Sequence, residues 1–258
     1  IEYGMLSDEK FCDRAMKFAL LKNTDGKYFS IDDYRKAIEG EQTDKDKKVV
    51  FLYATDVEAQ YSFIEAAKGR GYDVLLLDCQ LDSHFVNLLE TKVENARFAR
   101  VDSDSIDNLI PKEDKIRPEL SETDQEELTA IFKAVLPKDN EYLVQADNLG
   151  EHAAPILITQ SEFMRRYREM SAMGGGANFY GEIPAMYNIT VNMQNPLVAR
   201  IMASAADHKA DLEAFATGNE VLKQVTDLAL LANGLLKGKE LSDFIARSAK
   251  VVEDAYLK

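Results

Sequence analysis

The chain has 258 residues, enough for two domains with separate hydrophobic cores. Its net charge of −14 argues against binding to nucleic acid or anionic membranes, because affinity for phosphate groups comes from lysine and arginine. No apolar run approaches the ~20 residues of a membrane span, and the composition, 46% hydrophobic and 29% charged, is that of a folded globular protein.

Cysteine and histidine usage predicts no metal site and no catalytic residue. Cys12 and Cys79 are far apart in the sequence, and neither stands at metal-ligand spacing from a partner. We interpret both as packing residues in a reducing, cytoplasmic compartment. The three histidines lie in unrelated segments. The sequence opens without an initiator methionine or a signal peptide, so we expect it to be a piece of a longer protein.

The first 40 residues predict two helices separated by a turn. Ser7 is the expected N-cap of a helix over residues 7–21, whose apolar face carries Phe11, Ala15, Phe18 and Leu21. The run 23–26 (Asn-Thr-Asp-Gly) predicts the turn, and Ser30 is expected to cap the second helix.

From residue 49 onward, strands and helices alternate. Buried strands are predicted over residues 49–54, 72–77 and 96–101. A capping-box pattern at Thr55 predicts a helix over residues 55–67, and a further helix is expected over 82–89. This alternation implies right-handed crossovers, so residues 1–110 are expected to form a small three-layer αβα domain with a short parallel sheet.

An acidic tract with two prolines predicts a linker at residues 111–120, followed by an α+β domain over 121–258. Its expected helices cover residues 121–135, the segment after Thr159, and 195–206; its expected strands cover 142–145, 155–159 and 186–193. Thr159 and Glu162 have capping-box spacing, which predicts that a helix begins there.

The helix after Thr159 is a candidate binding surface. Its predicted apolar side carries Phe163, Met164, Tyr167, Met170 and Met173. Six of the eight methionines lie between Met164 and Met202, and surfaces rich in this deformable side chain suit binding to many partners. The alternative is a buried core helix. The three glycines at 174–176 favour exposure, because they leave the helix poorly anchored.

The end of the chain predicts two amphipathic helices joined by a glycine turn. Asn219 is the expected cap of the first, which ends at Asn233 and Gly234, and the second follows Gly238. Their apolar stripes pack either on their own domain or on the same helices of a second chain. In the second case the interface comprises Val221, Leu222, Val225, Leu228, Leu231, Leu235, Leu241, Phe244, Ile245 and Val252.

Asp78 offers an enzymatic alternative, because a strand that ends near an aspartate resembles the phospho-acceptor strand of response-regulator receivers. That chemistry also needs an acidic pair after the first strand and a lysine on a later strand, and the predicted strands provide neither. A receiver-like or doubly wound enzyme fragment and a purely structural dimerisation module therefore stand as alternatives.

Several short stretches together resemble the heat-shock protein 90 chaperone family of the bacterial HtpG type. They are residues 51–56 (FLYATD), 63–67 (FIEAA), 71–76 (GYDVLL), 80–82 (QLD), 163–166 (FMRR) and 228–234 (LALLANG). The resemblance implies the end of the middle domain followed by the C-terminal dimerisation domain.

The same resemblance implies a homodimer joined by a four-helix bundle of the last two helices. It also implies binding of non-native client proteins through Phe163, Met164, Tyr167, Met170 and Met173. The ATP-binding domain, with ATP and magnesium, is the part of such a chaperone that this piece does not contain, so we expect neither a cofactor nor ATP hydrolysis here. Residues 235–239 form a shorter connection than in many family members, which leaves the angle between the last two helices open.

Overall fold

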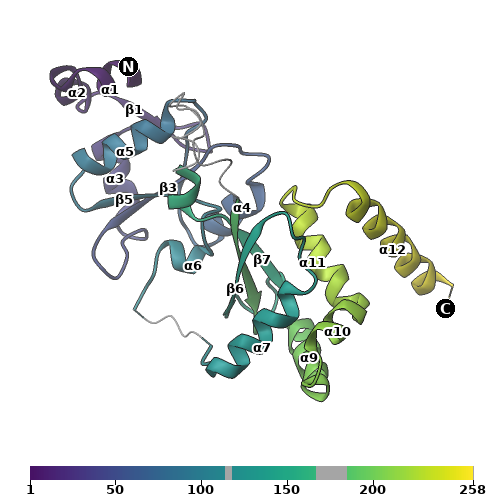
Figure 1. The fold of residues 1–258 in the computed structure, drawn as a ribbon. Coiled ribbons are helices and arrows are strands. Elements are labelled where there is room, and N and C mark those ends of the chain that lie inside the picture. The colour runs from purple at the N-terminus through teal and green to yellow at the C-terminus, as the bar shows by residue number, and fades with distance from the viewer. Residues whose placement is uncertain (114–117, 167–184, 258) are drawn as a thin grey trace, which may run out of the picture. The chain divides into compact units, whose positions relative to one another are not determined.

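Residues 1–113, 118–166 and 185–257 are described by a computed structural model of the chain (Figure 1). They fall into two compact units. Within the described ranges, the first unit comprises residues 1–113 and 160–166, and the second comprises 118–159 and 185–257. Residues 160–166 thus group with the first unit, although the sequence analysis assigns them to the second domain.

The first unit is built on a parallel sheet in the order β4-β3-β5. These strands are Val49–Ala54 (β3), Val74–Leu76 (β4) and Ala96–Arg100 (β5). Every residue of β3 is buried, as the uninterrupted apolar run predicts for a central parallel strand. The small parallel sheet expected from the sequence is confirmed.

Helices cover both faces of this sheet, because successive side chains of a strand point to opposite faces. Phe51 and Tyr53 lie in one core cluster with residues of α3 (Ile31–Ile38) and α5 (Asp82–Lys92). Leu52 and Ala54 lie in another, with residues of α4 (Tyr61–Gly69) and α6 (Ile106–Leu109). This unit therefore has three αβα layers.

The predicted helix over residues 7–21 is wrong. The chain forms two short helices, α1 (Glu2–Ser7) and α2 (Glu9–Ala15), and Asp8 rather than Ser7 accepts the capping hydrogen bond, from the Phe11 amide. Beyond them, Leu20–Lys22 (β1) pairs antiparallel with Tyr28–Ser30 (β2). The turn between these strands is confirmed, since the Asn23 side chain accepts from two amides of the turn and Gly26 has a φ of +79°.

The predicted helix start at Thr55 is also wrong, because α4 begins at Tyr61. The Gln60 side chain accepts hydrogen bonds from the amides of Thr55 and Asp56, and the Asp56 carboxylate accepts from those of Glu58 and Ala59. These side chains hold residues 55–60 in turns, so the helix begins six residues later.

The second unit contains a mixed sheet in the order β6-β8-β7. Its strands are Glu141–Asp147 (β6), Ile156–Thr159 (β7) and Met186–Asn192 (β8). The central β8 pairs parallel with β6 and antiparallel with β7. The sequence predicts the positions of these strands but not their pairing, in which β6 and β7 are not neighbours although they follow each other in the chain.

Helices complete the second unit. They are Glu122–Lys133 (α7), Pro196–Ala205 (α9), Ala206–His208 (η1), Leu212–Gly218 (α10), Glu220–Ala232 (α11) and Gly238–Tyr256 (α12). Buried residues of α7, α9 and α11 form one core with the sheet. Only η1 and α10 were not expected from the sequence. No helix in the described ranges is long and apolar enough to cross a membrane.

Candidate functional site

Helix α11 begins and ends where local signals in the sequence predict. The Asn219 side chain accepts a hydrogen bond from the Leu222 amide and caps α11. Gly234 follows the helix with a φ of +66°, and the amides of Gly234 and Leu235 return to the carbonyls of Leu231 and Leu230. This is the Schellman arrangement that ends a helix at a left-handed residue.

A polar cluster holds the middle of α12 against α11. The Arg247 guanidinium donates to the carboxylate of Asp227, whose side chain is buried, and to Gln224 Oε1 at 2.8 Å. Gln224 Nε2 in turn donates to Ser248 Oγ at 2.8 Å. Because the planar guanidinium makes two directed contacts across the pair, this cluster sets the angle between the helices that the short connection left open.

The ten predicted interface residues divide into three groups. Leu222 and Phe244 are buried in the core of their own unit. Val225, Leu235 and Leu241 are partly buried against that core. The other five are exposed, and they are Val221, Leu228, Leu231, Ile245 and Val252. Only this last group offers a substantial surface to a partner in the described conformation.

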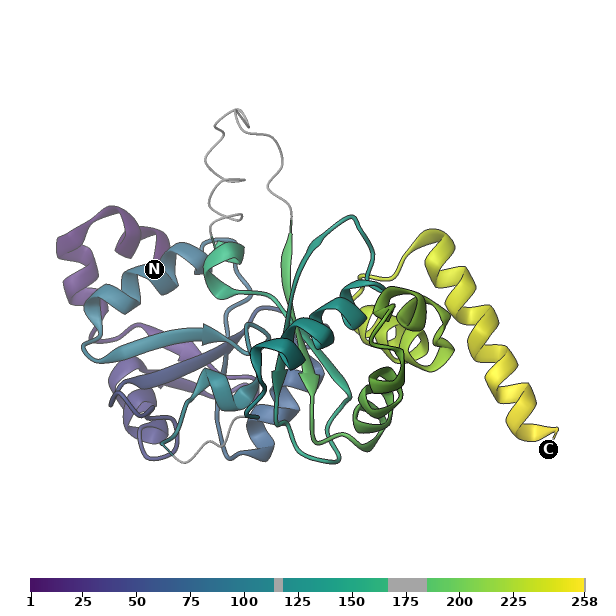
Figure 2. The same ribbon diagram turned by 60° about the horizontal axis from the view of Figure 1, so that its bottom comes forward.

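The exposed group belongs to a stripe that continues along α12. Phe244 is the one buried residue of this 19-residue helix. Val251, which shares the apolar spacing of this helix but is not among the ten predicted interface residues, is exposed beside Val252. Figure 2 shows α12 beginning beside the other helices of its unit and extending away from them toward the carboxyl end. We call the exposed residues Val221, Leu228, Leu231, Ile245, Val251 and Val252 the apolar stripe.

The predicted client-binding helix is described only in its first turn, residues 162–166. Phe163 is 73% exposed there, and Met164 is half-buried. Tyr167, Met170 and Met173 lie outside the described residues. A helix does begin here, at Glu162, but not through a capping box: Thr159 Oγ1 is buried with no hydrogen-bond partner among the described residues, and the Glu162 side chain is engaged elsewhere.

Charged groups hold this first turn on the sheet of the first unit. The Glu162 carboxylate accepts from the Tyr53 hydroxyl, from the Arg165 guanidinium at 2.7 Å and from the Arg100 amide at 3.2 Å. Arg166 donates to Glu162 at 2.6 Å and to Glu90 of α5 at 2.8 Å. Sequence reasoning missed this network because its members are far apart in the chain and no periodic pattern joins them.

The network shifts the pKa values of Glu162 and Tyr53. Burial alone raises the pKa of Glu162, but the adjacent guanidinium groups of Arg165 and Arg166 and the Tyr53 hydroxyl bring its pKa below the usual value. Burial, followed by the neighbouring Glu162 charge, raises the pKa of Tyr53. Glu162 is therefore ionised and Tyr53 neutral at neutral pH, as a donor hydroxyl and an acceptor carboxylate require.

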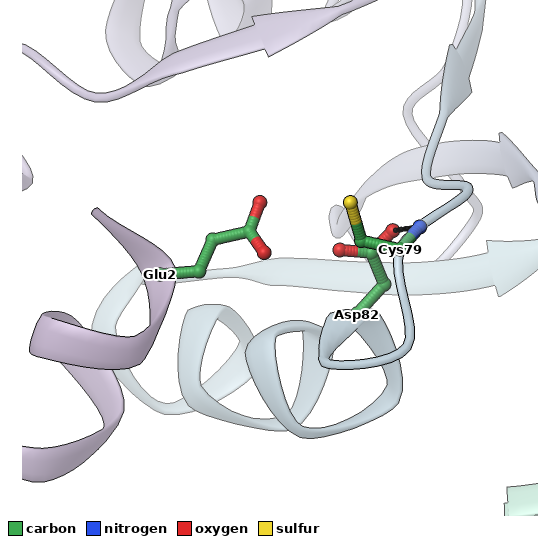
Figure 3. A group of neighbouring side chains, drawn as sticks. All are labelled: Glu2, Cys79 and Asp82. Carbon is green, nitrogen blue, oxygen red and sulfur yellow. Dashed lines mark hydrogen bonds between the residues drawn. The ribbon is translucent and has the colours of Figure 1, made fainter.

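A second polar group lies elsewhere in the first unit (Figure 3). Glu2, Cys79 and Asp82 each place one ligand-type atom within 4.8 Å of the other two. Burial, followed by the nearby charges of Glu2 and Asp78, raises the pKa of Asp82 to about 6 although the Cys79 amide donates to it. Cys12 is buried, but Cys79 is exposed in the loop after β4, so its interpretation as a packing residue is wrong. The Asp82 carboxylate, followed by Glu2, raises the pKa of the Cys79 thiol.

Asp78, the residue of the enzymatic alternative, is exposed just after β4. The basic residues of β5 are both arginines with other contacts: Arg97 donates to the Leu109 carbonyl, and Arg100 pairs with Asp102 at 2.5 Å. The phospho-acceptor arrangement thus receives no lysine from β5.

The comparisons with known proteins agree on one family. The sequence model of the family described as "Hsp90 protein" matches residues 1–256. The chaperone protein HtpG of Bacteroides fragilis strain YCH46 is 40% identical over 310 residues, which covers 98% of this chain and 46% of the relative. HtpG of Porphyromonas gingivalis strain W83 is also 40% identical, over 98% of this chain and 45% of the relative.

A third relative, HtpG of Bacteroides thetaiotaomicron, is 37% identical over 98% of this chain and 46% of its own length. The chain therefore spans about half the length of these curated relatives. The aligned span of 310 residues is also longer than the 258-residue chain, so the relatives carry segments within this region that the chain lacks.

Proposed function

The chain belongs to the Hsp90 family of chaperones, and from this premise we propose that it supplies the C-terminal part of such a protein. Residues 1–110 would end a middle domain, and residues 121–258 would form a homodimerisation domain that also helps to bind non-native client proteins. ATP and magnesium would bind in the part of the protein that this chain does not cover, so the chain itself would not hydrolyse ATP.

The observation that carries this proposal is the apolar stripe. Five of its six residues are at least half exposed, and they lie on two helices that the Arg247 cluster holds together. An amphipathic helix of 19 residues with one buried side chain gains little from its own unit. Pairing with the same two helices of a second chain would bury the stripe in a twofold four-helix bundle.

Charged substitutions within the stripe test the dimer. We expect Leu228→Asp combined with Ile245→Asp to give monomers, because closing the bundle would bury two carboxylates per chain without partners. The measurement is the molar mass from size-exclusion chromatography with light scattering.

Leu143→Asp is the matched control. Leu143 lies on β6 of the same unit and is 54% exposed, against 55% for Leu228, but it is outside the stripe. The control should keep the wild-type mass. A dimer that survives the double substitution would mean that the stripe is not the interface.

Client binding is proposed for the helix that begins at Glu162. Its first turn carries an exposed aromatic side chain, Phe163, and is held on the first unit by the hydrogen bonds of Glu162 and Arg166. An apolar surface that is fixed in this way suits binding of exposed apolar segments, because it is already held in place before binding.

The test is suppression of the aggregation of a chemically denatured enzyme. We expect Phe163→Ser to weaken suppression several-fold while the molar mass stays that of the wild type. Phe18→Ser is the control, because Phe18 is also an exposed phenylalanine of the first unit, at 55%, but lies outside this helix. Equal suppression by Phe163→Ser and wild type would instead favour a purely structural dimerisation module.

A further inference from the structure

The group formed by Glu2, Cys79 and Asp82 joins two segments that are distant in the sequence (Figure 3). Glu2 is the first residue of α1, whereas Cys79 lies in the loop after β4 and Asp82 begins α5. The two segments are held together by packing, since Met5 of α1 and Phe85 of α5 are buried in one core cluster. This packing therefore keeps the three side chains near one another.

One carboxylate oxygen of Asp82 accepts no hydrogen bond from the described residues. The Asp82 side chain is 5% exposed, and its Oδ2 accepts from the Cys79 amide at 2.7 Å. Its Oδ1 is buried and has no hydrogen-bond partner among the described residues. A buried acceptor left unsatisfied costs ~1–3 kcal/mol, and this one lies on the side of Asp82 where Glu2 and Cys79 gather.

A bound cation would satisfy this oxygen and at the same time offset the repulsion between the facing Glu2 and Asp82 carboxylates. Glu2 and Asp82 are carboxylates, Cys79 is a thiol, and none of the three belongs to an ion pair within the described ranges. Oxygen-only sites suit Mg²⁺ and Ca²⁺, whereas a thiolate beside carboxylates favours a softer cation such as Zn²⁺.

We propose that Glu2, Cys79 and Asp82 form a zinc-class divalent cation site, with water as the fourth ligand. In a tetrahedral zinc site the ligand atoms lie roughly 3.5 Å apart. The atoms here lie within 4.8 Å of one another, so the exposed Cys79 and half-buried Glu2 side chains need to move inward by about 1 Å. The bound cation would fasten α1 to the beginning of α5 and stabilise the first unit by mass action.

The experiment uses the full chain under a phosphine reductant and follows binding of Zn²⁺ by calorimetry and of Co²⁺ by absorption. We expect one saturable site per chain. Bound Co²⁺ should give a thiolate-to-metal charge-transfer band in the near ultraviolet. Cys79→Ser should abolish that band, and Asp82→Asn and Glu2→Gln should each weaken zinc binding by at least about tenfold. Asp82→Asn keeps an oxygen that can accept from the Cys79 amide, so its fold is retained.

Two variants serve as controls. Cys12→Ser removes the other thiol, which is buried in α2, and should leave the Co²⁺ band in place. Asp78→Asn removes a neighbouring charge but no ligand and should change the affinity by less than about threefold. The absence of saturable zinc binding would overturn the proposal, as would a charge-transfer band that persists in Cys79→Ser or disappears in Cys12→Ser.

Discussion

Glu162 anchors the start of the helix that we propose binds client proteins. It accepts hydrogen bonds from Tyr53, Arg165 and Arg166, and its side chain is 22% exposed. Loss of one partner from a fully buried ion pair costs ~3–5 kcal/mol, and partial exposure reduces that cost. The charge of this side chain therefore helps to hold residues 162–166 on the first unit, together with the contacts of Arg166 to Glu90 and to the Phe98 carbonyl.

Glu162→Gln should lower the free energy of opening of this segment by about 2 kcal/mol at pH 7. The folded protein holds the pKa of Glu162 below its ordinary value of 4.5, so the carboxylate stabilises the fold above that pH and the stabilisation is lost as the pH falls through the lowered pKa. The difference between variant and wild type should therefore shrink as the pH falls from 7 to below ~4.

Hydrogen exchange at two amides measures this opening. The Arg165 amide donates to the Ser161 carbonyl within the segment, and the Arg100 amide donates to the Glu162 carboxylate. Glu9→Gln is the control, since Glu9 pairs with Lys92 on the surface of the same unit at 3.8 Å and should matter little. If the opening free energies of Glu162→Gln and the wild type still differ by the same amount at low pH, the charge of Glu162 does not anchor the helix.

Gly234 shows what the sequence predicts well at the scale of the element. Its backbone φ of +66° costs an L-residue ~1–2 kcal/mol, so Gly234→Ala should destabilise the second unit by about that amount. Gly218→Ala should be neutral or stabilising, because Gly218 ends α10 with helical backbone and no atom lies within 4 Å of an added Cβ. The midpoint of urea unfolding, measured at one fixed protein concentration, distinguishes the two variants. Equal shifts of the midpoint in Gly234→Ala and Gly218→Ala would contradict the role given to the φ of Gly234.

Element boundaries are predictable where one local signal acts alone, and the prediction fails where another hydrogen-bonding partner competes for the same backbone groups. Asn219 and Gly234 lie beside the helix that they bound, and the prediction for α11 is confirmed. At Thr55 the capping pattern is also local, but the amides of Thr55 and Asp56 donate to the Gln60 side chain, and the helix begins only after Gln60. At Leu20, pairing with Ser30 overrides the apparent helical spacing.

At the scale of the whole molecule, the parallel sheet is predictable because buried apolar runs alternate with helices. The return of residues 160–166 to the first unit is not, because it depends on contacts such as Arg166 with Glu90, which no periodicity encodes. For the same reason, Glu2 could not be associated with Cys79 from spacing alone. The apolar stripe was predicted as a pattern, but only the structure separates its exposed residues from Leu222 and Phe244, which are buried.

The central claim is that the apolar stripe of α11 and α12 is covered by a second copy of the chain. Light scattering of the wild-type chain, over concentrations from about 1 to 100 µM, tests it most directly. The account predicts a molar mass of twice the 29.0 kDa protomer at the upper end of this range. A mass of 29.0 kDa throughout would contradict it.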